Sequence, residues 1–308
     1  MGAWACAWAA EAESLADAVA LAYKTNPTLL SQRAQLRVTD ETYVQARAGY
    51  RPQVSLQASG ERRDYVQQTA NSGSLYLVTK QPIYTGGRTA SAVSAAEADI
   101  LAGRETLRGA ETTVLVQVIQ AYADVLRDQQ DVAIRQTSLR DLTDQLTEAQ
   151  SRAKVGDLTR TDVAQSQGYL FQAKADLASA QAQLEASRAN YAAVVGQRPL
   201  ALEPLPVLGG MPAALDQAFA AGEAGNSALR AAQYAEQAAR LRTAEARDQR
   251  LPNVTLQVQY GQSGPVSPFL PNAYARDAGA TVTVTQPLFA GGMIDSQVRQ
   301  QIQREAAA

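Results

Sequence analysis

The sequence has 308 residues, a formal net charge of −2 and no histidine. A chain without histidine lacks the commonest general base and metal ligand, and its near-neutral charge provides no electrostatic footprint for nucleic acid. The single cysteine, Cys6, excludes an internal disulfide and a cysteine-cluster metal site, so we expect no cofactor, no metal, no nucleic-acid partner and no enzyme activity.

Residues 1–13 are expected to be a signal-peptide remnant or a disordered tail. Ala-x-Ala patterns typical of signal cleavage occur at 7–9 and 10–12, but a charged n-region is missing. Both interpretations stay open, and the residues before Cys6 disfavour its lipid modification. No window of the chain approaches the ~18 consecutive apolar residues of a transmembrane helix.

Two parts of the chain repeat each other. Pro52 corresponds to Pro252 at an offset of 200, and Gln81 corresponds to Gln286 at an offset of 205. Each copy predicts helix, strand, loop, strand and helix, which is strong evidence for an internal repeat. We predict a first repeat at 14–198 with a β-hairpin at 52–84, a linker and equatorial segment at 199–224, and a second repeat at 225–308 with a β-hairpin at 252–289.

The predicted strands, of about 9–11 residues, alternate apolar and polar side chains with the period of a two-faced sheet. A soluble sandwich with one wet face would show the same alternation, but the polar positions here hold Gln, Ser and Thr rather than Lys and Glu, which favours a pore lining. The expected pore-lining residues are Gln53, Ser55, Gln57, Thr255, Gln257, Gln259, Thr281 and Thr283. Four strands cannot close a membrane barrel, so the chain needs copies of itself, and three copies would give twelve strands.

The end of each hairpin carries a strand-to-helix turn. The turn residues are Pro82, Gly86 and Gly87 in the first repeat and Pro287, Gly291 and Gly292 in the second. The aromatic residues Tyr84 and Phe289 occupy equivalent strand ends. They fit either an interfacial aromatic girdle or ordinary core packing.

Long helices are predicted at 87–154 and 157–196, because no proline interrupts this part of the chain and apolar residues recur with a helical period. The first helix would extend roughly 100 Å, too long for one small domain. In the second, large residues recur every seven positions, as in a coiled coil: Val163, Leu170, Leu177, Leu184 and Tyr191. Carboxylates such as Asp128 and Asp131 are expected at solvated positions rather than in a catalytic site.

These motifs resemble the TolC family of outer-membrane efflux factors from Ser14 to Gln303. The resemblance rests on Asn26-Pro27, Arg51-Pro52, the repeated Gln-Pro-(Ile/Leu)-(Tyr/Phe)-x-Gly-Gly segment and the run 155–163. It implies an α+β membrane protein. Long antiparallel coiled-coil helices would form a periplasmic α-barrel, and two β-hairpins would contribute four strands to a trimeric, 12-stranded outer-membrane β-barrel.

The resemblance also implies a function: passive export of small molecules or proteins by a channel subunit of a tripartite efflux or type I secretion system. The implied partners are a homotrimer, a periplasmic adaptor, an inner-membrane ABC or RND transporter, and outer-membrane lipid. The implied location is the outer membrane of a Gram-negative bacterium, with a periplasmic extension. The alternative is a periplasmic coiled-coil adaptor or scaffold without a membrane barrel.

Thr161 and Asp162 match a Thr-Asp pair that helps to hold the periplasmic gate of this family closed. Both residue types also favour helix starts, so an N-cap is the competing interpretation. If the second repeat is complete in the protein, about 93 further residues follow Ala308, and they would contain the partners of this gate.

Overall fold

The computed structural model describes residues 13–65, 68–206, 209–210, 212, 214–265 and 274–308. Apart from Glu13, the predicted signal remnant at 1–13 lies outside the described residues, and so does Cys6. The elements in chain order are α1 (Leu15–Thr25), α2 (Pro27–Ala48), β1 (Gln53–Tyr65), β2 (Gln68–Tyr84), α3 (Arg88–Lys154), α4 (Arg160–Val195), α5 (Leu215–Gly225), α6 (Ser227–Asp248), β3 (Asn253–Pro265), β4 (Ala275–Thr285) and α7 (Met293–Ala307). Among the described residues, no helix is both long and apolar enough to cross a membrane.

The chain folds into two compact units. The first contains residues 1–33 and 107–224, and the second contains 34–106 and 225–308. This division does not follow the two predicted repeats, because the second unit joins the first hairpin to the second. The physical reason is backbone pairing: β2 of the first repeat forms an antiparallel ladder with β3 of the second.

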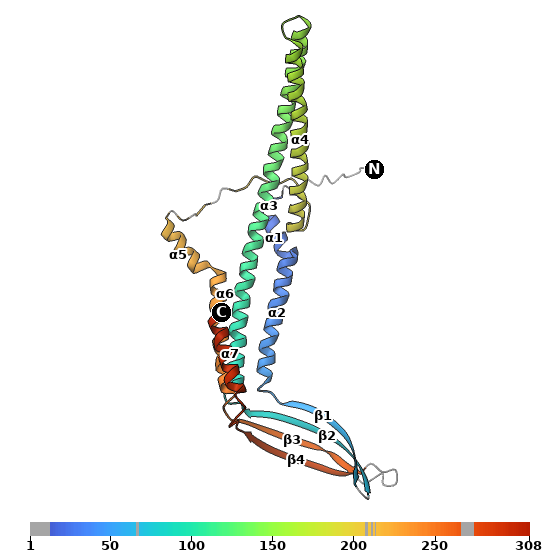
Figure 1. Ribbon diagram of the computed structural model, residues 1–308, viewed down its shortest axis with the longest axis vertical. Helices are drawn as coiled ribbons and strands as arrows, with labels where there is room; N and C mark the ends of the chain where they lie inside the picture. The colour runs from blue at the N-terminus through green and yellow to red at the C-terminus, as the bar shows by residue number, and fades with distance from the viewer. Residues whose placement is uncertain (1–12, 66–67, 207–208, 211, 213, 266–273) are drawn as a thin grey trace, which may run out of the picture. The chain divides into compact units, whose positions relative to one another are not determined.

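The first unit is built on two long helices, and Figure 1 shows α4 lying beside the later part of α3. The predicted heptad seam is confirmed at Leu170, Leu184 and Tyr191, which are buried together with the small residues Ala173 and Ala180. The other two large residues of the seam, Val163 and Leu177, are half-buried. Small residues let two helices approach closely. The core of this unit also includes side chains from α1 and α3: Ala18, Ala22, Val118, Tyr122 and Val125.

Local signals set the ends of the helices. Ser14 caps α1 and Thr159 caps α4, each with an aspartate three residues later that completes a capping box. Helix α4 ends at Val195, and the C-cap residue Gly196 has a φ of 95°, a left-handed conformation that suits glycine. Helix α4 begins at Arg160, three residues later than the predicted start at 157, because the residues before Thr159 form the turn from α3.

The second unit contains a four-stranded antiparallel sheet in the order β1-β2-β3-β4 (Figure 1). The two hairpins have the same register, because Gln53 pairs with Lys80 and Asn253 pairs with Thr285, which are equivalent residues of the repeat. This arrangement confirms the predicted combination of long helices and two hairpins. Strand β2 has 17 residues, well beyond the predicted length. Ladder hydrogen bonds join backbone groups, so pairing continues where side chains no longer alternate.

The predicted linker at 199–224 contains a helix. Helix α5 precedes Asn226 just as α1 precedes Asn26, and both asparagine side chains accept hydrogen bonds from the first turn of the next helix. The structural repeat therefore starts before residue 225.

Candidate functional site

The sheet brings all the predicted polar strand positions to one face. Residues that pair directly across antiparallel strands share a face, and one such row joins Gln53, Lys80, Gln257 and Thr281 across the four strands. Counting in steps of two from this row gives the same face to Ser55, Gln57, Thr255, Gln259 and Thr283.

The opposite face is apolar and uncovered in the described part of the chain. Two of its large side chains, Val254 and Leu256, are half-buried. The others have exposed fractions between 41% and 69%, and they are Val54, Leu56, Leu75, Leu77, Val258, Tyr260, Val282 and Val284. A contiguous apolar surface of this kind is unusual on a soluble monomer and typically marks a contact with another protein or with lipid. The two faces therefore suit two different environments.

Strand β2 departs from the simple pattern. Val78 is only 3% exposed although it lies on the polar face, and Tyr76 is half-buried on the same face. The polar face also carries four charged residues outside the predicted polar positions: Glu61, Arg63, Lys80 and Asp277. The polar face is therefore not made of Gln, Ser and Thr alone. Because β2 alternates irregularly, its own sequence does not show on which face Lys80 lies. The pairing of β2 with β1 and β3 determines that face.

The sheet has two open edges. In the described ranges, β1 pairs only with β2 and β4 pairs only with β3, so each outer strand presents a row of backbone groups without a partner strand. Open edges of this length are a template for pairing with another chain.

The strand-to-helix turns are built alike in both repeats. Gly86 and Gly291 have φ values of 65° and 61°, and the glycines after them, Gly87 and Gly292, also have positive φ. The glutamine before each turn proline holds the helix-to-strand corner beside it. Gln81 Nε2 donates to the Tyr50 carbonyl at 2.9 Å, and Gln286 Nε2 donates to the Arg250 carbonyl at 2.7 Å.

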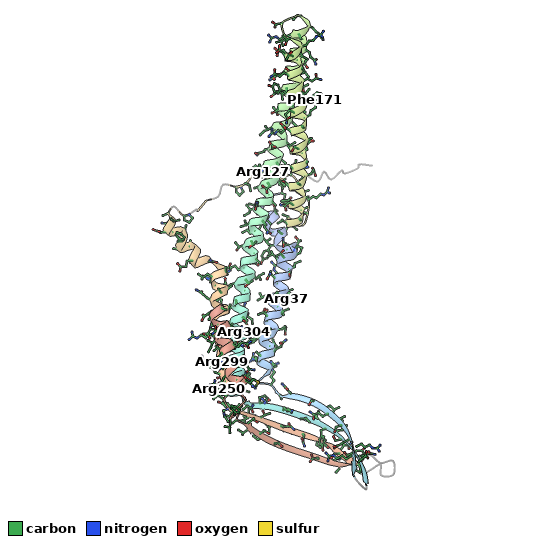
Figure 2. The ribbon with its side chains drawn as sticks, viewed as in Figure 1. Arg37, Arg127, Phe171, Arg250, Arg299 and Arg304 are labelled. Atoms are coloured by element: carbon green, nitrogen blue, oxygen red, sulfur yellow. The ribbon has the colours of Figure 1, made fainter. Side chains whose placement is uncertain are left out.

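Aromatic residues lie where β2 and β4 end: Tyr84 is the last residue of β2, and Phe289 follows β4. Tyr84 is 49% exposed and Phe289 is 89% exposed. Arg250 lies at the same end, where α6 meets the sheet (Figure 2), and forms an ion pair with Asp295 at the start of α7. Exposed aromatic side chains at strand ends fit an interface between apolar and aqueous surroundings.

The turn between α3 and α4 contains the two predicted gate residues. Thr161 is exposed in the first turn of α4, and the carboxylate of Asp162 accepts hydrogen bonds from the backbone N–H of Thr159 at 2.9 Å and from its hydroxyl at 2.7 Å. These two hydrogen bonds lower the pKa of Asp162. The capping residue is Thr159, so the proposed N-cap role belongs two residues before Thr161, and Asp162 completes the cap.

Asp128 is not solvated, contrary to the expectation from the sequence. It is buried against α4, where Ser187 Oγ donates to its carboxylate at 2.5 Å, and Arg127 forms an ion pair with it. Burial alone would raise the pKa of Asp128, but the hydrogen bonds from Ser187 and Arg127 outweigh it and lower the pKa. The heptad places the polar residue Ser187 in the seam, and this position was the sequence signal that a polar residue of α3 lies opposite Ser187.

A second buried polar cluster joins residues that are far apart in sequence. Tyr191 Oη donates to the Glu13 side chain at 2.7 Å, while Tyr122 Oη donates to the backbone carbonyls of Glu13 and Glu203. The backbone of Glu13 also forms an isolated parallel β-bridge with Leu202. These hydrogen bonds join the residue before the cap of α1 to α3, α4 and the segment after α4. Within the described ranges no group of acidic or cysteine side chains could hold a metal ion.

The comparisons with known proteins agree with this geometry. The family model described as outer membrane efflux protein matches residues 18–197 and 222–308. The outer membrane efflux protein BepC of Brucella suis biovar 1 (strain 1330) is 32% identical over 293 residues, which cover 95% of this chain. The chain spans 64% of the length of that curated relative.

Solved structures of outer-membrane proteins share the fold. The CmeC outer membrane channel of Campylobacter jejuni has a TM-score of 0.82 at 14% identity, over 98% of this chain and 70% of CmeC. The outer membrane protein VceC of Vibrio cholerae has a TM-score of 0.77 at 20% identity, over 95% and 73% of the two chains. The resemblance found in the sequence is thus confirmed, and the family consists of outer-membrane transport proteins rather than enzymes. The chain belongs to the outer membrane efflux protein family.

Proposed function

We propose that this chain is a subunit of an export channel in the outer membrane of a Gram-negative bacterium. Three copies join edge to edge, β4 of one copy beside β1 of the next, and close a twelve-stranded barrel. The apolar face contacts lipid and the polar face lines the lumen. The long helices extend the conduit into the periplasm, where an adaptor links it to an inner-membrane ABC or RND transporter that supplies the energy.

One observation carries the proposal: a single four-stranded sheet has an apolar face, a hydrophilic face and two open edges. The charged residues of the apolar face, Arg62, Asp64 and Arg276, all lie toward the end of the sheet away from the helices. The apolar side chains between Val54 and Ala58 alternate with Gln53, Ser55 and Gln57, so the same strand serves both surfaces. A barrel is the arrangement that covers every edge of such a sheet in a bilayer, because unpaired backbone groups are costly in lipid.

We further propose that the turn between α3 and α4 is the periplasmic gate. Thr161 is exposed there, and Asp162 keeps its negative charge through the cap of α4. The turn is formed by 155–159, and Val155 in it is 80% exposed. Arg152, near the end of α3, forms an ion pair with Asp157 of the turn. An exposed, polar end of a long coiled coil is suited to contacts that open and close.

Adjacent residues of β1 provide the test. Lys at position 56 would lie on the lipid face, where a charge near the bilayer centre costs about 2–4 kcal/mol, whereas Lys at position 57 would lie in the lumen. Leu56→Lys should prevent insertion of the purified protein into planar bilayers, while Gln57→Lys should insert as often as the unaltered protein does. The measurement is the number of conductance steps for each protein at equal concentration.

Equal insertion of the two variants would contradict the assignment of the faces. A purified protein that stays monodisperse in buffer without detergent and produces no conductance would overturn the channel itself. It would favour the adaptor or scaffold function instead.

A further inference from the structure

A positively charged side chain lies among neutral ones on the polar face, at the helical end of the sheet. Lys80 of β2 is exposed, and its cross-strand partners are Gln53 and Gln257. Both partners are uncharged amides. In the described part of the chain, no carboxylate forms an ion pair with Lys80.

The other charges of this face lie toward the opposite end of the sheet. Glu61 and Arg63 form an ion pair of 2.6 Å, and the carboxylate of Asp277 accepts a hydrogen bond from Gln259. Asp277 pairs with Gly261, and four residues of β3 separate that row from the row of Lys80. This is about 13 Å along the strands, more than the Debye length of about 10 Å at 0.1 M salt. The carboxylate therefore leaves the charge of Lys80 largely uncompensated.

The repeat puts no second cation at the equivalent position. Lys80 pairs with the first residue of β1, and the corresponding partner of the first residue of β3 is Thr285. Each chain thus contributes one positive charge at this level of the sheet, and a closed trimer would place three at the same height.

We propose that Lys80 forms a cationic ring in the lumen and biases the channel toward anions. The proposal rests on the function inferred above, because only a closed barrel turns one face of the sheet into a lumen. Rings of Lys or Arg select anions in pores, since they raise the local concentration of negative ions and repel positive ones.

The test is the permeability ratio of K⁺ to Cl⁻, measured from the reversal potential of the purified protein in planar bilayers with unequal KCl on the two sides. Lys80→Gln should raise this ratio about twofold at ~0.1 M salt, and Lys80→Glu should raise it further. Lys80→Arg should restore the original ratio. At ~1 M salt the differences should shrink, because the Debye length falls to about 3 Å.

Arg276→Gln is the matched control. It removes a positive charge from the same sheet, but Arg276 pairs with Gln262 and lies on the apolar face, so the ratio should stay unchanged. If the channels conduct and neither Lys80→Gln nor Lys80→Glu moves the ratio, the cationic ring is overturned and the channel stands. If the unaltered protein does not conduct, the proposed function is overturned and the ring falls with it.

Discussion

At the scale of single residues, the repeat provides matched positions whose surroundings differ. Gly86 and Gly291 occupy the same turn with nearly the same positive φ, so a side chain is equally strained in the backbone at either place. Their neighbours are not alike. A Cβ at Gly86 would lie 2.7 Å from Leu251 Cβ, whereas a Cβ at Gly291 would meet nothing within 4 Å. Backbone conformation and close packing can therefore be separated.

We predict that Gly86→Ala destabilises the protein more than Gly291→Ala. The shared left-handed conformation costs about 1–2 kcal/mol for alanine. Within one chain, crowding against Leu251 adds about 1–3 kcal/mol at Gly86 and nothing at Gly291, so the comparison is made on the monomer. The measurement is the free energy of unfolding of each variant by urea titration in detergent, followed by far-UV circular dichroism. Equal losses would mean that the segment between α6 and β3, which contains Leu251, moves aside and that the contact with Gly86 is not tight.

At the scale of elements, the features that follow a periodic pattern could be predicted from the sequence, whereas contacts between distant residues could not. The seven-residue spacing on α4 identified the seam at Leu170, Leu184 and Tyr191, and the repeat located both hairpins. The buried site of Asp128 was missed because its partner Ser187 comes from the other helix. The link from Glu13 to Tyr191 was also missed, because it joins residues that no local pattern relates.

The face of Lys80 is a case between these two. Strand β2 alternates imperfectly, since Leu75 and Leu77 are interleaved with Tyr76 and Val78, and its face could not be chosen from its own sequence. Pairing with β1 and β3, whose alternation is clean, determines it. The face on which a residue of β2 lies therefore depends on three strands, and it cannot be read from the sequence of β2 alone.

The start of α4 allows the cap and the gate to be distinguished. Asp162→Ala removes both the carboxylate and one half of the capping box, while Thr159→Ala removes the capping hydroxyl and leaves the carboxylate in place. If the charge of Asp162 holds the gate, Asp162→Ala should raise the single-channel conductance and Thr159→Ala should not. A similar rise in both variants would assign the effect to fraying of the helix, and no rise in either would remove Asp162 from the gate.

At the scale of the whole molecule, the repeat predicts how copies pair. The two hairpins obey one register when positions of β3 are shifted by 200 and positions of β4 by 205 relative to β1 and β2. Inside the chain, Val78 of β2 pairs with Gln259 of β3. The same shifts turn this pair into Thr283 of β4 and Ser59 of β1, which lie on opposite open edges of the sheet. If successive hairpins around the barrel are equivalent, Thr283 of one copy faces Ser59 of the next.

A disulfide tests this register directly. Directly opposed residues of antiparallel strands have Cα atoms about 4.5–5.5 Å apart, within the range that a disulfide can bridge. In a Cys6→Ser background, Thr283→Cys with Ser59→Cys should therefore form a covalent trimer on a denaturing gel without reductant. Thr283→Cys with Gln53→Cys is the control, because six residues along β1 move the second thiol by about 20 Å. Cross-linking of the control pair alone would show a shifted register between copies. Cross-linking of neither pair would mean that the edges of β1 and β4 do not meet in the register that the repeat predicts.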